Sequence, residues 1–135
     1  MNKEKGFTLI ELIIVLGIIS LIAAIIYPNF LKIQEKAKLS ALKTTSHSLE
    51  MAIESYYLTA GSYPEGSNLA VTELVSTLKS SGELTKDPVN PFTGKIYTAQ
   101  DASGKIVYNA TDNNEKYSLT AYGKNNETVV VLLGD

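Results

Sequence analysis

The chain has 135 residues, enough for one domain of modest size with an appendage but too few for two full domains. Its net charge is −2 and it has no long basic run, which argues against a dedicated nucleic-acid-binding protein. The absence of cysteine excludes disulfides, thiolate metal sites and thiol nucleophiles.

The first predicted element is a helix that is apolar on all sides. Residues 12–31 contain no charged side chain, and the mostly apolar stretch extends over residues 7–30. A bilayer core of about 30 Å is spanned by about 20 helical residues. A domain of this size has little interior in which to bury such a helix, so the stretch predicts a membrane anchor.

A removable secretory signal is the competing interpretation, because residues 1–5 resemble a charged region ahead of an apolar one. Such a signal should end in a small-residue cleavage site. Ala23 and Ala24 are small, but they are followed by a pattern that continues the same helix. We therefore expect the anchor to be retained.

A short motif lies at the start of the apolar stretch. It reads Lys5-Gly6-Phe7-Thr8-Leu9-Ile10-Glu11-Leu12. With its short charged leader, and with Pro28 at the family's usual distance, the motif resembles the class III signal of type IV prepilins and pseudopilins. The resemblance implies that a prepilin peptidase cuts between Gly6 and Phe7, and that the new amino group of Phe7 is methylated.

Glu11 is the one charged residue within the apolar stretch. A carboxylate near a bilayer centre costs about 2.5–3.5 kcal/mol on insertion scales, so its presence there indicates a function. The alternative is a side chain that reaches back to the membrane interface. The resemblance implies that Glu11 pairs with the amino terminus of Phe7 in a neighbouring subunit, and it assigns Phe7, Glu11 and Pro28 to filament assembly.

The helix is predicted to extend over residues 7–60. Beyond Pro28, apolar or small residues recur three and four apart, as in an amphipathic helix. They are Leu39, Leu42, Ser46, Leu49, Ile53 and Tyr56. Because proline lacks an N–H and clashes with the preceding turn, we expect a bend over residues 24–28. Gly61 is a suitable left-handed cap for the end of the helix.

The rest of the chain predicts a shorter helix and then a sheet. The helix is expected over residues 69–80, with Ser67 or Asn68 as its cap, and the proline-rich residues 87–91 are expected to form a surface loop. Further on, the apolar period changes to two, which is typical of strands. The predicted strands are residues 95–100, 105–110, 116–122 and 128–133.

The predicted fold class is α+β. A long N-terminal α-helix, with a projecting apolar half and a packed amphipathic half, carries a C-terminal antiparallel β-meander of about four strands. The resemblance implies that this is the type IV pilin fold. We divide the chain into a leader over residues 1–6, a transmembrane and filament-core half-helix over 7–30, and a globular head over 31–135.

Catalytic and metal sites are not indicated. The chain has no Ser-His-Asp set, no paired catalytic carboxylates and no glycine-rich phosphate loop, so we expect no enzyme activity. His47 is the sole histidine, and the turn carboxylates Asp101, Asp112 and Glu115 do not form a dense cluster. We expect no metal ion and no cofactor.

Three functions are compatible with the sequence. The first is the subunit of an extracellular type IV pilus for adhesion, surface motility or colonisation, and the second is a pseudopilin of a type II secretion or DNA-uptake system. The third is a monomeric membrane-anchored binding domain.

The resemblance implies as partners further copies of the chain, prepilin peptidase, an assembly ATPase with its membrane platform, and lipid before assembly. It implies an inner-membrane precursor and a surface filament.

Overall fold

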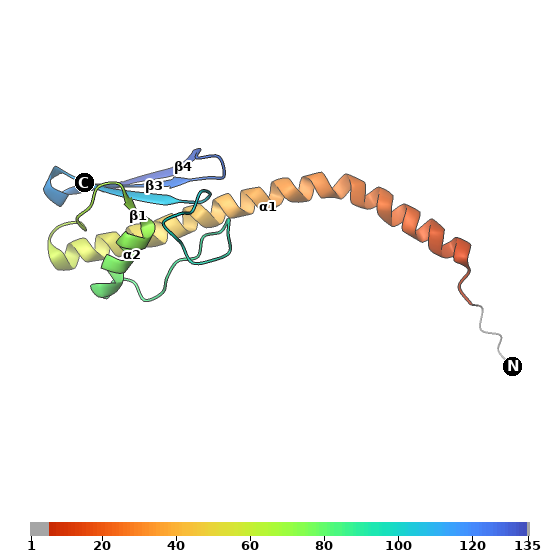
Figure 1. Cartoon of the computed structure of the whole chain (residues 1–135), viewed down its shortest axis with the longest axis horizontal. Helices are drawn as coiled ribbons and strands as arrows, with labels where there is room; N and C mark the ends of the chain where they lie inside the picture. Colours follow the sequence, from red (N-terminus) through yellow and green to blue (C-terminus); the bar gives the residue numbers. More distant parts are fainter. Residues whose placement is uncertain (1–5, 135) are drawn as a thin grey trace. The chain divides into compact units, whose positions relative to one another are not determined.

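The computed structural model describes residues 6–134, and the chain divides into two compact units with their sequence boundary between Lys36 and Ala37 (Figure 1). The elements follow one another as α1 (Leu9–Ala60), β1 (Leu69–Ala70), α2 (Val71–Ser80), β2 (Ile106–Thr111), η1 (Asp112–Asn114), β3 (Lys116–Tyr122) and β4 (Thr128–Gly134). Of the predicted leader, only Gly6 lies among the described residues.

Helix α1 is the long helix that the sequence predicts. It begins at Leu9 rather than Phe7, because Thr8 caps its first turn, and it continues through Pro28. At its other end Gly61 adopts a φ of +77° and donates its N–H to the Tyr57 carbonyl oxygen at 2.8 Å, as expected of a left-handed cap. In the first unit, every described residue is exposed.

The head, which is the second unit, contains one antiparallel sheet with the strand order β1-β2-β3-β4. The sequence predicted β3 to the residue and β2 and β4 to within one residue at each end. Across the sheet, Tyr108 on β2 lies opposite Leu119 on β3, which in turn lies opposite Leu132 on β4. The α+β class and the four-stranded antiparallel sheet are confirmed.

The predicted strand over residues 95–100 is wrong. Only Ile96 makes an isolated bridge, to Val89, and the chain then turns where the Thr98 N–H donates to the Asp101 carboxylate. The fourth strand is instead β1, which pairs with β2.

Helix α2 therefore starts at Val71, two residues later than predicted, because Leu69 and Ala70 belong to that strand. Its N-cap residue is Ala70, which offers no side-chain hydrogen bond, so neither Ser67 nor Asn68 is the cap. The backbone N–H of Asn68 donates instead to the side chain of Asn109 on β2.

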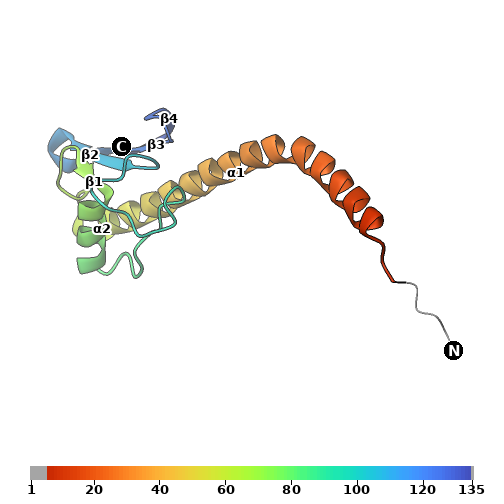
Figure 2. The same ribbon diagram turned by 45° about the vertical axis from the view of Figure 1, so that its right-hand side comes forward.

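The core of the head forms where the amphipathic part of α1 meets the sheet and α2. Leu42, Ser46, Leu49 and Ile53 of the predicted stripe are buried, and Leu39 and Tyr56 are half-buried. Figure 2 shows the strands and α2 grouped around this part of α1. The other large buried side chains of the core include Leu74 and Leu78 from α2, Tyr108 from β2 and Leu119 from β3.

Candidate functional site

The start of α1 carries a reciprocal capping arrangement between Thr8 and Glu11. The backbone N–H and the hydroxyl of Thr8 both donate to Oε2 of Glu11, at 2.8 and 2.7 Å. The Glu11 N–H donates back to the Thr8 hydroxyl oxygen at 3.3 Å. A threonine followed three residues later by a glutamate is the capping-box pattern, which satisfies two donors that an α-helix otherwise leaves open at its N-terminus.

The predicted cleavage junction lies directly ahead of this capping box. Gly6 and Phe7 precede α1 and are exposed, with the Phe7 side chain at 73% of its full accessibility. Among residues 6–134, no atom lies within 4 Å of a Cβ added at Gly6. Of the four predicted site residues, the structure therefore brings Gly6, Phe7 and Glu11 together at one end of the chain, whereas Pro28 lies far along α1.

Most of the remainder of the first unit presents an apolar surface. All its large apolar side chains, from Phe7 to Ile33, are exposed. Ser20 turns its hydroxyl back to the Leu16 carbonyl oxygen at 2.7 Å, which leaves no unsatisfied donor on the surface at that point. Part of the helix face forms an apolar hollow of about 480 Å³, lined by Ile19, Ile22, Ala23, Ile26, Tyr27 and Phe30.

Among the residues that the structure describes, α1 is the one helix long and apolar enough to cross a membrane. Its apolar segment has none of its surface buried against the rest of the chain. An apolar surface of this extent requires either lipid or other protein around it. The arrangement therefore suits a segment that is surrounded by lipid or by other proteins.

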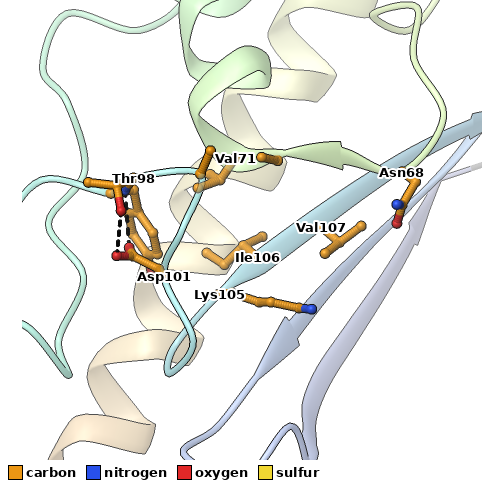
Figure 3. A pocket seen from close by; sticks show the side chains of 10 residues that line it. Asn68, Val71, Thr98, Asp101, Lys105, Ile106 and Val107 are labelled. Carbon is orange, nitrogen blue, oxygen red and sulfur yellow. Dashed lines mark hydrogen bonds between the residues drawn. The ribbon is translucent and has the colours of Figure 1, made fainter.

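A cavity of about 180 Å³ lies in the head between the start of α2, β2 and the turn at residues 97–101 (Figure 3). Val71 and Ile106 form part of its apolar lining, and Asp101 lies at its polar side. Ligand pockets usually enclose about 300–1,000 Å³, so this cavity is too small for most organic ligands.

The carboxylate of Asp101 is bound by the chain itself. It accepts hydrogen bonds from the Thr98 N–H, the Thr98 hydroxyl and the Asn90 side-chain amide, at 2.8–3.1 Å. Burial acts to raise the pKa of Asp101, but the hydrogen bonds from Asn90 and Thr98 outweigh it and hold the pKa below its ordinary value. Asp101 is therefore a structural acceptor in this turn.

Two other residues considered for a metal ion each pair with a neighbouring side chain. Asp112 lies 3.2 Å from the Lys116 ammonium group, and His47 forms its contact with Glu50 at 2.8 Å. Within residues 6–134, no three His, Cys, Asp or Glu side chains lie close enough to hold a metal ion.

The sequence analysis did not predict two features of the structure, the capping role of Thr8 and the buried position of Asn90. The capping role of Thr8 could have been found from the Thr-x-x-Glu spacing alone. The fully buried Asn90 could not, because its partners Asp101 and Ser103 approach it only in the fold.

Comparison with known families gives two matches that together cover most of the chain. Residues 1–27 match the family model described as the prokaryotic N-terminal methylation motif. Residues 29–130 match the model described as type II secretion system protein G.

Curated relatives include several pilins. The chain is 42% identical over 66 residues to the type IV major pilin protein PilA of Myxococcus xanthus, a match that covers 49% of the chain and 30% of that protein. It is 31% identical over 118 residues to the type IV major pilin protein PilE1 of Neisseria gonorrhoeae, covering 87% of the chain and 52% of that protein.

A third relative is matched over a larger part of its own length. The chain is 33% identical over 122 residues to a fimbrial protein of Neisseria meningitidis serogroup B, covering 90% of the chain and 68% of that protein. The chain thus spans about a third to two thirds of these three relatives. No solved structure matches it.

Proposed function

Because the chain belongs to the type IV prepilin and pseudopilin family, we propose that it is a structural subunit of a type IV pilus. The observation that carries the proposal is the set of large apolar side chains from Phe7 to Ile33, all of which are exposed in the single subunit. Packing these helices side by side in an extracellular helical filament removes that surface from water. The filament serves adhesion, surface motility or colonisation.

Before assembly the same surface lies in lipid. The precursor is a single-pass protein of the inner membrane, and prepilin peptidase removes residues 1–6 and leaves Phe7 as an N-methylated terminus. The exposed, non-helical setting of Gly6 and Phe7 supports access by such an enzyme. An assembly ATPase and its membrane platform then move the subunit from the bilayer into the growing filament, where it is part of a surface pilus.

Glu11 sets the axial position of each incoming subunit. Its carboxylate pairs with the cationic amino terminus of Phe7 in a neighbour, within the apolar interior of the filament. Removing one partner of a buried ion pair costs about 3–5 kcal/mol, because it leaves the other charge uncompensated. Only the axial offset between subunits that brings the Glu11 carboxylate to the Phe7 amino group avoids this cost.

Pro28 contributes a point at which α1 can bend. It has no N–H to donate to the Ala24 carbonyl oxygen, so the helix lacks one of its hydrogen bonds there although it remains helical. Pro28 is the one proline inside α1, so this hydrogen bond is missing at one position of the helix. We therefore assign to Pro28 the adjustment of helix direction that packing into a filament requires.

A pseudopilin is the second candidate, and one observation favours it: residues 29–130 match type II secretion system protein G. The pilin assignment is preferred because the curated relatives named above are pilins or fimbrial proteins. The two functions share the anchor and the assembly step, and they differ in the length and location of the filament.

Electron microscopy of sheared surface fibres, combined with mass spectrometry of their protein, tests the proposal. We expect long fibres whose main component is this chain, beginning at N-methyl-Phe7. Short filaments confined to the cell envelope would support the pseudopilin function instead. Processed chain found only as single subunits in the membrane would contradict both and support a membrane-anchored binding domain.

A further inference from the structure

The carboxylate of Glu11 is engaged on one of its two oxygens. Oε2 accepts hydrogen bonds from the N–H and from the hydroxyl of Thr8, at 2.8 and 2.7 Å. Oε1 accepts none from the residues that the structure describes. A carboxylate oxygen offers about two acceptor positions, so Oε2 is saturated while Oε1 stays available.

We propose that Thr8 is a positioning residue for assembly, which holds Glu11 so that Oε1 faces the amino terminus of an incoming subunit. This inference rests on the proposed function, because it concerns the same pairing of Glu11 with Phe7 of a neighbour. The new element is the role of Thr8, whose side chain contacts the Glu11 carboxylate. Thr8 acts through Glu11.

The capping box survives the processing step. All of its hydrogen bonds join Thr8 to Glu11, and both residues lie on the C-terminal side of the bond between Gly6 and Phe7. Removal of the leader therefore leaves the box intact. The carboxylate that meets a neighbour in the filament has the same orientation as the one in the precursor.

The orientation helps assembly for two physical reasons. A glutamate side chain in an exposed first turn has several rotamers, and binding is favoured when the bound rotamer is already selected. In addition, a carboxylate in apolar surroundings is destabilised unless donors satisfy it, and Thr8 supplies two donors before the neighbour arrives.

Three variants separate positioning from helix capping alone. Thr8→Ser keeps the hydroxyl, and Thr8→Val removes it from a side chain of similar shape. Thr8→Gly also removes the hydroxyl, yet glycine at an N-cap weakens a helix by only a few tenths of a kcal/mol. If Thr8 serves only as a cap, Thr8→Gly should assemble nearly as well as the natural chain. If it positions Glu11, Thr8→Gly should fail like Thr8→Val.

The measurement is the fraction of full-length chain that is recovered in sheared fibres as N-methyl-Phe7 subunits. We expect this fraction to fall about three- to tenfold in Thr8→Val and Thr8→Gly, as for the loss of the hydrogen bond from the Thr8 hydroxyl to the Glu11 carboxylate, and to stay near the natural value in Thr8→Ser. Hydrogen exchange in the membrane-embedded chain should be faster at the Glu11 amide in both hydroxyl-free variants.

Glu11→Ala in the same assay separates this inference from the proposed function. If Glu11→Ala lowers incorporation but Thr8→Val and Thr8→Gly assemble normally, the role of Thr8 is wrong and that of Glu11 stands. Normal assembly of Thr8→Gly with failure of Thr8→Val reduces Thr8 to a cap and overturns the inference. Normal assembly of Glu11→Ala overturns the pairing itself. Equal exchange of the Glu11 amide in all three Thr8 variants would show that the Thr8 hydroxyl does not bond Glu11, which also overturns the inference.

Discussion

The hydroxyl of Tyr117 on β3 donates a hydrogen bond of 3.0 Å to the carboxylate of Glu54 on α1. The Tyr63 hydroxyl approaches the same carboxylate at 3.3 Å, and the rings of Tyr63 and Tyr117 meet edge to face with centroids 4.7 Å apart. The sheet, the segment after α1 and α1 itself are thus joined at Glu54. In a chain without cysteine, such contacts hold the β3 region on the helix.

Replacing Tyr117 by phenylalanine should destabilise the head. The variant keeps the ring and loses one hydrogen bond to a charged acceptor, so the free energy of unfolding should fall by about 1.5–3 kcal/mol. Denaturant unfolding of the full chain in detergent, followed by circular dichroism, measures the change. Tyr122→Phe on the same strand is the control, because its hydroxyl donates no hydrogen bond within residues 6–134. Equal stability of the two variants would contradict this role of Glu54.

Alkaline pH should also destabilise the head. Burial raises the pKa of Tyr97, Tyr108 and Tyr117 above the ordinary value for tyrosine. Above about pH 10, the unfolded chain loses these phenolic protons while the folded chain retains them, so the free energy of unfolding falls as pH rises. Unfolding midpoints measured from pH 8 upward should decline above about pH 10, with a shallower decline in Tyr117→Phe. A midpoint that stays constant through this range would refute the prediction.

The loop between α2 and β2 should depend on Asn90. Its side chain is fully buried, donates to Asp101 and to the Ser103 carbonyl oxygen, and accepts the Phe92 N–H, each at 2.9 Å. At about 1 kcal/mol for each hydrogen bond, Asn90→Ala should lower the free energy of unfolding by about 3 kcal/mol. Thermal unfolding provides the measurement, and Asn125→Ala, at an exposed turn position, is the matched control. A loss no greater than that of the control would show that the loop is held by other contacts.

Processing should depend on Gly6 because the peptidase must accommodate this residue, and not because Gly6 packs within the subunit. A Cβ at this position meets no atom within 4 Å among the residues that the structure describes, so Gly6→Glu should fold normally while its bulk and charge obstruct the peptidase. Immunoblotting of membranes should show uncut precursor. A Cβ at Gly17 likewise meets nothing, and Gly17→Ala should be cut normally. Efficient cleavage of Gly6→Glu would place the junction elsewhere.

Features with a local cause were predictable from the sequence. The apolar stretch, the stripe from Leu42 to Ile53 and the glycine cap at Gly61 each depend on residues within a few helical turns. Strands β2, β3 and β4 were also predicted, because each alternates apolar and polar residues between clear turns.

Features that depend on distant partners were not predictable in this way. Residues 95–100 have the composition of a strand, yet Thr98 and Asp101 form a turn there. Leu69 and Ala70 continue the pattern of α2, but they pair with Tyr108 and Val107, which lie far along the sequence. In the candidate site, the motif identified Glu11 but not its contact with Thr8, which is local and follows the Thr-x-x-Glu capping pattern.

The most direct test of the account is the recovery of Glu11→Ala in sheared surface fibres, relative to the natural chain and to Glu35→Ala, which removes another exposed carboxylate of α1. Mass spectrometry of the membrane fraction should show that all three chains begin at Phe7, which separates cleavage from assembly. We predict that Glu35→Ala enters fibres normally and that Glu11→Ala is cleaved but absent from them or strongly depleted. Fibres with a natural content of Glu11→Ala would contradict the pairing of Glu11 with Phe7.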